Sequence, residues 1–211
     1  VDLFGTTIIF DAQLLALCTV VLIAGILRGF AGFGSALIVV PALAMYVGPA
    51  QAVVIEVIIE IPVTLGLLPT AIQKADRKTV LPMIAMFVLF VPIGAFLLRY
   101  IDPTPMKILL SLLVLVMLGV ITFQRQLASL MRPSAVLVTG ALAGLSQGLT
   151  AIGGPIFATA ILARNEPADQ TRANLVALAA ALITLSVASF WFIGLIHAAS
   201  IALAIVTAPA L

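Results

Sequence analysis

Charged side chains are scarce in this chain of 211 residues. Asp, Glu, Lys and Arg make up 9% of it, against about 25% in ordinary soluble domains. Apolar residues make up 64%. So few charges cannot solvate a globular surface of this size, but they suffice for the loops of a membrane helix bundle. The net charge of +2 comes from scattered basic residues, so the sequence has no basic patch for nucleic acid.

The single cysteine and the single histidine narrow the chemistry further. Cys18 has no partner for an internal disulfide or a multi-cysteine metal site, and we interpret it as a small buried hydrophobic residue. His197 falls in an expected loop, which argues against a bis-histidine haem or zinc site. The sequence has neither a nucleotide-binding glycine loop nor a plausible serine–histidine pair. We therefore expect no cofactor, no metal and no enzymatic activity.

Long apolar runs separated by turn residues predict an all-α, polytopic membrane bundle. A spanning helix needs about 20 mostly apolar residues. Expected helices cover residues 12–29, 35–47, 50–72, 79–99, 104–123, 134–149, 155–164, 167–192 and 197–211.

A glycine pattern occurs twice and predicts an internal duplication. Gly25, Gly29 and Gly34 recur 119 positions later as Gly144, Gly148 and Gly153. We expect a first transmembrane repeat over 1–123, a linker over 124–133 and a second repeat over 134–211.

The second repeat is expected to be truncated. Val91-Pro92 matches Ala208-Pro209, so Leu211 falls midway through an expected helix. By this match, about one and a half further helices should follow.

Basic residues in the loops predict that the repeats have opposite orientations. The 74–78 loop has three basic residues and the 124–133 linker has two, so both are expected in the cytoplasm. The amino terminus, with Asp2 and Asp11, is expected outside. The loop that corresponds to 74–78 in the second half, 194–197, has no formal charge. Opposite preferences of matching loops indicate an inverted repeat.

The segments 35–47 and 155–164 are too short to cross a bilayer of about 30 Å at about 1.5 Å per residue. Because glycines precede both, they are expected to be broken or re-entrant helices. The alternative is that Gly25, Gly29 and their second-half counterparts only let helices pack closely. That alternative does not account for Pro155, which belongs in the first turn of a helix.

Charged residues inside apolar runs are the first candidate site residues. Arg28 either binds an oxyanion through its planar fork or is a structural residue, snorkelling or ion-paired. Glu56 and Glu60 share one helix face. At least one of them is expected to be protonated, paired with Arg28 or facing water, which makes protons a candidate coupling ion; Glu56 is otherwise simply solvated. Arg172 either reaches the same cavity or neutralises Asp169.

Neutral donors at the two glycine-rich breaks complete the expected substrate site. Backbone amides at the start of a short helix attract anions without a net charge. The candidates from the breaks and their neighbours are Gly34, Ser35, Gln147, Thr150, Gly153 and Gly154.

The two break motifs carry a resemblance to a known family. Residues 29–35, GFAGFGS, followed by Pro41, and residues 148–155, GLTAIGGP, resemble the TauE/SafE sulfite exporter family over nearly the whole chain. The first motif has Phe33-Gly34-Ser35 where the family commonly has a glycine triplet.

The resemblance implies a multi-pass permease of the bacterial inner membrane, with about eight spans, that exports sulfite or a C2 organosulfonate such as sulfoacetate. Two alternatives stay open: an anion channel or importer of another small solute, and a non-transporting membrane scaffold subunit. Exposed Gly, Ala and Phe faces permit a homodimer.

Overall fold

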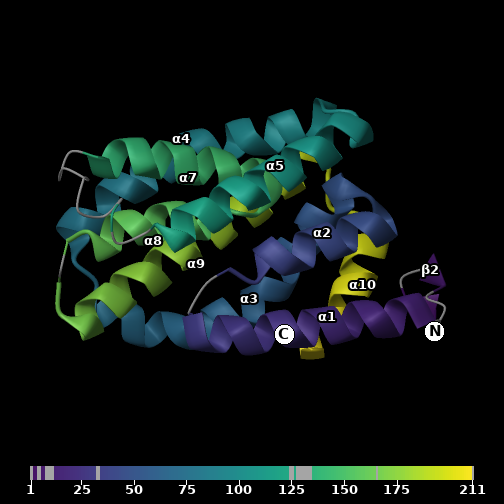
Figure 1. The fold of residues 1–211 in the computed structure, drawn as a ribbon, viewed down its shortest axis with the longest axis horizontal. Helices are drawn as coiled ribbons and strands as arrows, with labels where there is room; N and C mark the ends of the chain where they lie inside the picture. Colours follow the sequence, from purple (N-terminus) through teal and green to yellow (C-terminus); the bar gives the residue numbers. More distant parts are fainter. Residues whose placement is uncertain are drawn as a thin grey trace.

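The structure, a computed structural model, describes residues 2–3, 6–7, 12–31, 34–123, 126, 135–164 and 166–210. Figure 1 shows an elongated bundle in which most helices run along the long axis. The helices are α1 (Ala12–Ala31), α2 (Ala36–Val47), α3 (Pro49–Lys74), α4 (Arg77–Tyr100), α5 (Pro103–Thr122), α7 (Ala135–Thr150), α8 (Gly154–Leu162), α9 (Ala168–Ile193), α10 (Ala198–Thr207) and the short 3-10 turn η1 (Ala208–Ala210).

The helices agree closely with those expected from the sequence, so the all-α prediction is confirmed for the main body of the described chain. The exception is a two-stranded antiparallel hairpin, β1 (Asp2–Leu3) and β2 (Thr6–Thr7), which the sequence analysis did not predict. The linker expected at 124–133 lies almost wholly outside the described residues.

Four of the described helices are long and apolar enough to cross a membrane: Pro49–Pro69 of α3, then α4, α5 and α9. α1, α2, α7 and α10 are apolar but contain shorter apolar stretches. Large apolar side chains are exposed on the outside, for example Leu15, Met45 and Phe192. A surface of this kind is suited to lipid rather than water, so the chain is a multi-pass membrane protein.

Proline and glycine mark the helix ends. Pro49 and Pro103 occupy the first turns of α3 and α5, where the missing amide hydrogen costs nothing. Asp76 caps α4 by accepting a hydrogen bond from the Lys78 amide at 3.1 Å. α9 ends at Gly194, whose φ of 76° closes the helix in the left-handed conformation.

The tightest helix contact joins α4 to α7. A Cβ on Gly94 would lie 2.3 Å from the Leu145 carbonyl oxygen, and one on Gly148 would lie 2.1 Å from that of Val91. Only hydrogen at both positions allows the backbones to approach so closely. Gly148, and Gly144 against Phe90, therefore serve helix packing, as the packing alternative for these glycines predicts.

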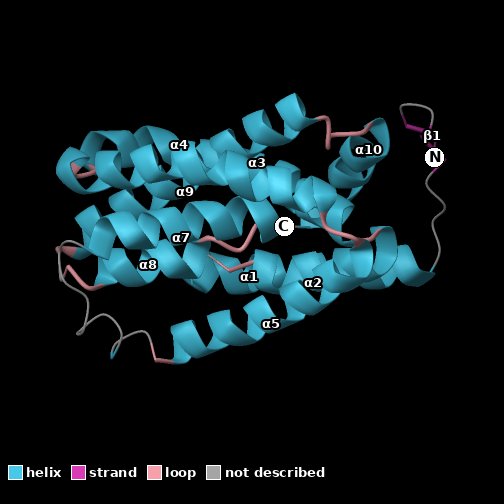
Figure 2. Ribbon diagram, turned by 90° about the horizontal axis from the view of Figure 1, so that it is seen from above, coloured by secondary structure: helices cyan, strands magenta, loops and turns pink. Residues whose placement is uncertain are grey.

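The chain reverses direction at two points inside the bundle (Figures 1 and 2). α2 follows α1 and packs back against it, and α8 does the same with α7. We call residues 32–35 the first junction and residues 151–153 the second junction. Only Gly34 and Ser35 of the first junction are described.

The helices α3 and α9 are antiparallel and lie side by side. The end of α3 contacts the start of α9, and the start of α3 contacts the segment after α9. At one end Lys74 pairs with Asp169 at 3.1 Å, and the Asp76 amide donates to Asn174 Oδ1 at 2.7 Å. A hydrogen bond from the Thr79 hydroxyl lowers the pKa of Asp76. At the opposite end Gln51 Nε2 lies 3.0 Å from His197 Nδ1. We call the end that holds the Lys74–Asp169 ion pair the charged end.

Candidate functional site

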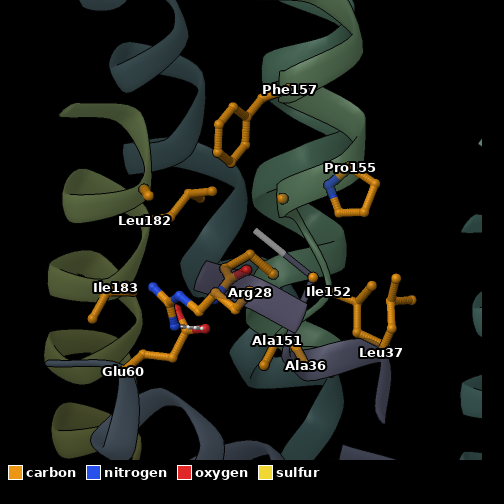
Figure 3. A pocket seen from close by; sticks show the side chains of 14 residues that line it. Arg28, Ala36, Leu37, Glu60, Ala151, Ile152, Pro155, Phe157, Leu182 and Ile183 are labelled. Carbon is orange, nitrogen blue, oxygen red and sulfur yellow. Dashed lines mark hydrogen bonds and ion pairs between the residues drawn. The ribbon is translucent and has the colours of Figure 1, made fainter. Parts of the chain in front are cut away.

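A cavity of about 50 Å³ lies where the two junctions meet. Its polar lining comes from Arg28 at the end of α1, Glu60 on α3 and Gln147 on α7. The starts of α2 and α8 contribute Gly34, Ala36, Leu37, Gly154 and Pro155. Figure 3 shows Arg28 and Glu60 facing each other beside the apolar wall, which includes Phe157, Leu182 and Ile183.

Arg28 is held by an ion pair inside the bundle. Its Nη1 donates to Oε1 of Glu60, and the two side chains are only 11% and 17% exposed. Arg28 also lies in the last turn of α1, where the helix dipole favours a cation. The structure thus realises the ion-paired alternative, while the guanidinium still lines the cavity.

Ser35 faces the acidic residues of α3 rather than the cavity. Its hydroxyl lies 2.6 Å from Glu60 Oε1 and 3.1 Å from Glu56 Oε1. Glu56 is 1% exposed, and its second oxygen, Oε2, has no hydrogen-bond partner among the described residues. Arg28, Glu60, Ser35 and Glu56 therefore form one connected cluster that extends from the cavity into the core.

The backbone at Gly34 positions this cluster. Its φ of 98° lies in the region that disfavours every residue with a side chain. α2 begins directly after it, and Ser35 makes no side-chain cap bond to the helix. The Ala36 amide makes no hydrogen bond to any described residue. Among the described residues, nothing caps the amino end of α2, where Ala36 lines the cavity.

The second junction is held by hydrogen bonds with the last turns of α7. Gln147 Oε1 accepts from the Gly153 amide at 3.0 Å, and the Ser146 hydroxyl donates to the Ile152 carbonyl at 2.7 Å. The Thr150 hydroxyl donates to the Ser146 carbonyl at 2.8 Å and is fully buried. These bonds fix the backbone without any charged group.

Two hydrogen-bond donors at the second junction are available to bind a ligand in the cavity. Because Oε1 of Gln147 faces the Gly153 amide, its NH₂ group must point elsewhere, and it makes no hydrogen bond within the described part of the chain. The Gly154 amide likewise has no bond to a described residue. Both residues line the cavity.

Glycine is required at 153 for a different reason than at 34. A Cβ on Gly153 would lie 2.6 Å from the Ala143 carbonyl oxygen and 2.9 Å from Gln147 Cβ. The start of α8 therefore packs directly on α7. The neighbouring Ala151 has a φ of 59°, a conformation that costs a non-glycine residue about 1–2 kcal/mol.

The structure brings together only part of the expected site. Arg28, Gly34, Glu60, Gln147 and Gly154 line the cavity. Ser35, Glu56, Thr150 and Gly153 lie directly behind it and hold its walls through the bonds described above.

Arg172 lies in a different place from the other candidates. It is exposed and lines a separate pocket with Lys74 and Asp169 at the charged end of the bundle. Asp169 pairs with Lys74, and Arg172 has no ion pair among the described residues. The structure does not bring it to the central cavity.

Sequence reasoning missed the apolar wall and the role of Ser146. Phe157, Leu182 and Ile183 shape the cavity, but in the sequence they look like any other apolar residues of a buried helix.

No group of three or more His, Cys, Asp or Glu side chains that could hold a metal occurs in the described ranges.

Comparison with protein-family models decides the family. The model described as "Sulfite exporter TauE/SafE" matches residues 17–211. The chain belongs to the TauE/SafE family. Members of this family are membrane transporters of sulfite and organosulfonates, not enzymes. Searches of curated proteins and of solved structures found no match.

Proposed function

We propose that this TauE/SafE protein is a secondary transporter that exports sulfite, or a C2 organosulfonate such as sulfoacetate, across the bacterial inner membrane. One observation carries the proposal: the amino ends of α2 and α8 and the guanidinium of Arg28 open onto one cavity. Helix amino ends carry positive partial charge and free amide donors, so each stabilises an anion by about 0.3–1 kcal/mol. The family supplies the substrate class.

The size of the cavity favours the smaller substrates. A volume of about 50 Å³ holds roughly three to five water-sized groups. Sulfite is of this size, whereas sulfoacetate would need the two junctions to move apart. The oxygens of the anion would accept from Arg28, from the Gln147 NH₂ group and from the amides of Ala36 and Gly154.

Two inverted repeats with re-entrant helices are the second element of the proposal. α2 has 12 residues and α8 has nine, which gives lengths of roughly 18 Å and 14 Å, about half a bilayer. The start of α3 contacts the segment after α9, and the start of α9 contacts the segment after α3. Such reciprocal contacts between antiparallel helices support a twofold relation. One repeat would rock against the other to alternate access.

Protons as the coupling ion and a homodimer belong to the same proposal. The cluster has two carboxyl groups, Glu56 and Glu60, and a single guanidinium, so one bound proton would balance its charge.

α5 is the least buried of the long apolar helices, which makes its outer face the candidate for contact with a second copy.

Counterflow in proteoliposomes tests the transport function. Vesicles loaded with unlabelled sulfite and diluted into radiolabelled sulfite should accumulate label transiently above equilibrium, because a carrier exchanges one anion for another. Equilibration without an overshoot would indicate a channel, and no flux of any sulfur oxyanion would refute the proposal. Thermal-shift measurements with sulfite, sulfoacetate, taurine, isethionate and thiosulfate would rank the substrates, since a ligand that binds only the folded form raises its melting temperature.

A further inference from the structure

The guanidinium of Arg28 already has an anion bound to it. Glu60 Oε1 accepts from Arg28 Nη1, and both side chains line the cavity. A carboxylate and a sulfur oxyanion bind a guanidinium in the same way, through paired oxygens. The side chain of Glu60 therefore occupies the position that a transported anion needs.

We infer that Glu60 is a built-in competitor that a substrate anion displaces from Arg28, and that the displaced carboxylate takes up one proton. The inference rests on the proposed transport function and specifies how the anion site is regulated. In the exchange a monovalent anion replaces the carboxylate at the guanidinium, and one proton passes from hydronium or a buffer acid in the solvent to Glu60. The donor's bond to this proton breaks, an O–H bond forms on Glu60, and the charge of the cavity is the same before and after.

Within the described chain, a displaced Glu60 has no cation other than Arg28 near it. Arg28 on α1 and Glu56 on its own helix are the charged groups near it among the described residues. Gln147 is neutral, and α8 and α9 present Phe157, Leu182 and Ile183. Gly32 and Phe33, which connect α1 to Gly34 in the sequence, have no titratable side chain. An ionised Glu60 without Arg28 would be an unpaired charge in an apolar site, which is strongly unfavourable.

The Ser35 hydroxyl can form a hydrogen bond with the protonated form of Glu60. Its hydroxyl is 2.6 Å from Glu60 Oε1 and 3.1 Å from Glu56 Oε1. A hydroxyl can both donate and accept, so Ser35 can accept the new O–H of Glu60 while it donates to Glu56. More distant titratable groups belong to other parts of the bundle: His197 lies beside Gln51, and Asp169 beside Lys74.

Proton uptake on binding tests the exchange directly. Methanesulfonate is a suitable probe because it is small, monovalent and does not titrate near neutral pH. We expect the wild-type protein to take up about one proton for each anion bound, and its affinity to rise by up to about tenfold for each unit of falling pH. Titration calorimetry in buffers of different ionisation enthalpy measures both quantities.

The variant Glu60→Gln removes the competitor. We expect it to bind methanesulfonate at least tenfold more tightly, without proton uptake and without dependence on pH. The matched control is Glu166→Gln, which removes the carboxylate of another Arg–Glu pair, with Arg164, outside the cavity. This control should keep the wild-type affinity and proton uptake.

Several results would overturn the inference. Binding by the wild type without proton uptake would contradict the exchange and leave the transport function intact. Weaker binding by Glu60→Gln would show that Glu60 supports the anion rather than competes with it. Loss of proton uptake in Glu56→Gln but not in Glu60→Gln would place the proton on Glu56. If Glu60→Gln fails to fold, the number of protons that the wild type takes up for each bound anion decides whether the exchange occurs. Absence of binding of both methanesulfonate and sulfite to the wild type would contradict the transport function itself.

Discussion

The two junctions have similar backbone roles but opposite chemistry. At the first junction the side chains are charged or turn to charged groups: Arg28 pairs with Glu60, and Ser35 contacts Glu56 and Glu60. At the second junction the side chains of Gln147 and Ser146, from the end of α7, bind only backbone groups of the junction. Both deliver a helix amino end to one cavity. The comparison suggests that the first half supplies charge and its regulation, and the second half a fixed neutral wall.

Among the predictions, Gly153→Ala is expected to have the largest effect, a loss of folding stability. The added Cβ would lie 2.6 Å from a backbone oxygen of α7, and because α8 packs directly on α7 neither segment can yield cheaply. We expect a loss of about 3 kcal/mol or more in stability, measured as a shift of the chemical denaturation midpoint in detergent. Gly66→Ala on α3, where a Cβ would meet no atom within 4 Å, is the control and should not destabilise the protein. An unchanged midpoint for Gly153→Ala would show that the second junction is not rigid.

The next largest effect is expected from Arg28→Gln. Loss of charge-assisted hydrogen bonds worth about 2–3 kcal/mol should weaken sulfite binding by about 100-fold. Calorimetry on the folded variant measures this change. Lys74→Gln removes an exposed cation paired with Asp169 outside the cavity and should bind like the wild type. Equal affinity of Arg28→Gln and wild type would remove Arg28 from the anion site.

Gly34→Ala should lower the folding stability by a smaller amount, through backbone strain rather than a steric clash. A Cβ at this position meets only Leu37 Cδ1, at 3.8 Å, so the cost is the conformational strain of a φ of 98°, about 1–2 kcal/mol. The strain should also displace Ser35 from the carboxyl groups, so the pH dependence of sulfite binding should change as well. A variant with wild-type stability and wild-type pH profile would mean that Gly34 does not fix the first junction.

The smallest effect is expected from Ala151→Gly. Glycine relieves the strain of the φ of 59° but adds freedom to the unfolded chain. The two terms largely cancel, and we expect a gain in stability of about 0–1 kcal/mol. Denaturation under the same conditions as for Gly153→Ala measures it. A clear loss of stability would show that the Ala151 methyl group packs usefully in the cavity wall.

The sequence predicted the helices well because proline, glycine and charged loops mark their ends. Pro49, Pro103 and Gly194 end or begin helices for local reasons that need no tertiary information. The short helices after Gly34 and Gly153 were predicted in the same way. The hairpin of Asp2–Leu3 with Thr6–Thr7 was not, because its strands are too short to show any alternation.

The site was predicted only in part because side-chain direction depends on tertiary packing. The scarcity of charge made Arg28 and Glu60 candidates, and pairing with Arg28 was one of the outcomes expected for the acidic residues. That Ser35 faces α3 rather than the cavity follows from the backbone at Gly34, which no sequence pattern specifies. Arg172 shares a helix with the cavity residues Leu182 and Ile183 but lies several turns away, near the charged end.

The location of the bound anion tests the central claim most directly. Crystals of the protein grown with sulfite can be measured at a long wavelength, where sulfur scatters anomalously and the methionines and Cys18 serve as internal references. The account predicts one additional sulfur peak in the cavity, within hydrogen-bonding reach of Arg28, the Ala36 amide and the Gly154 amide. A sulfite peak at any other place in the bundle, with this cavity empty, would contradict it.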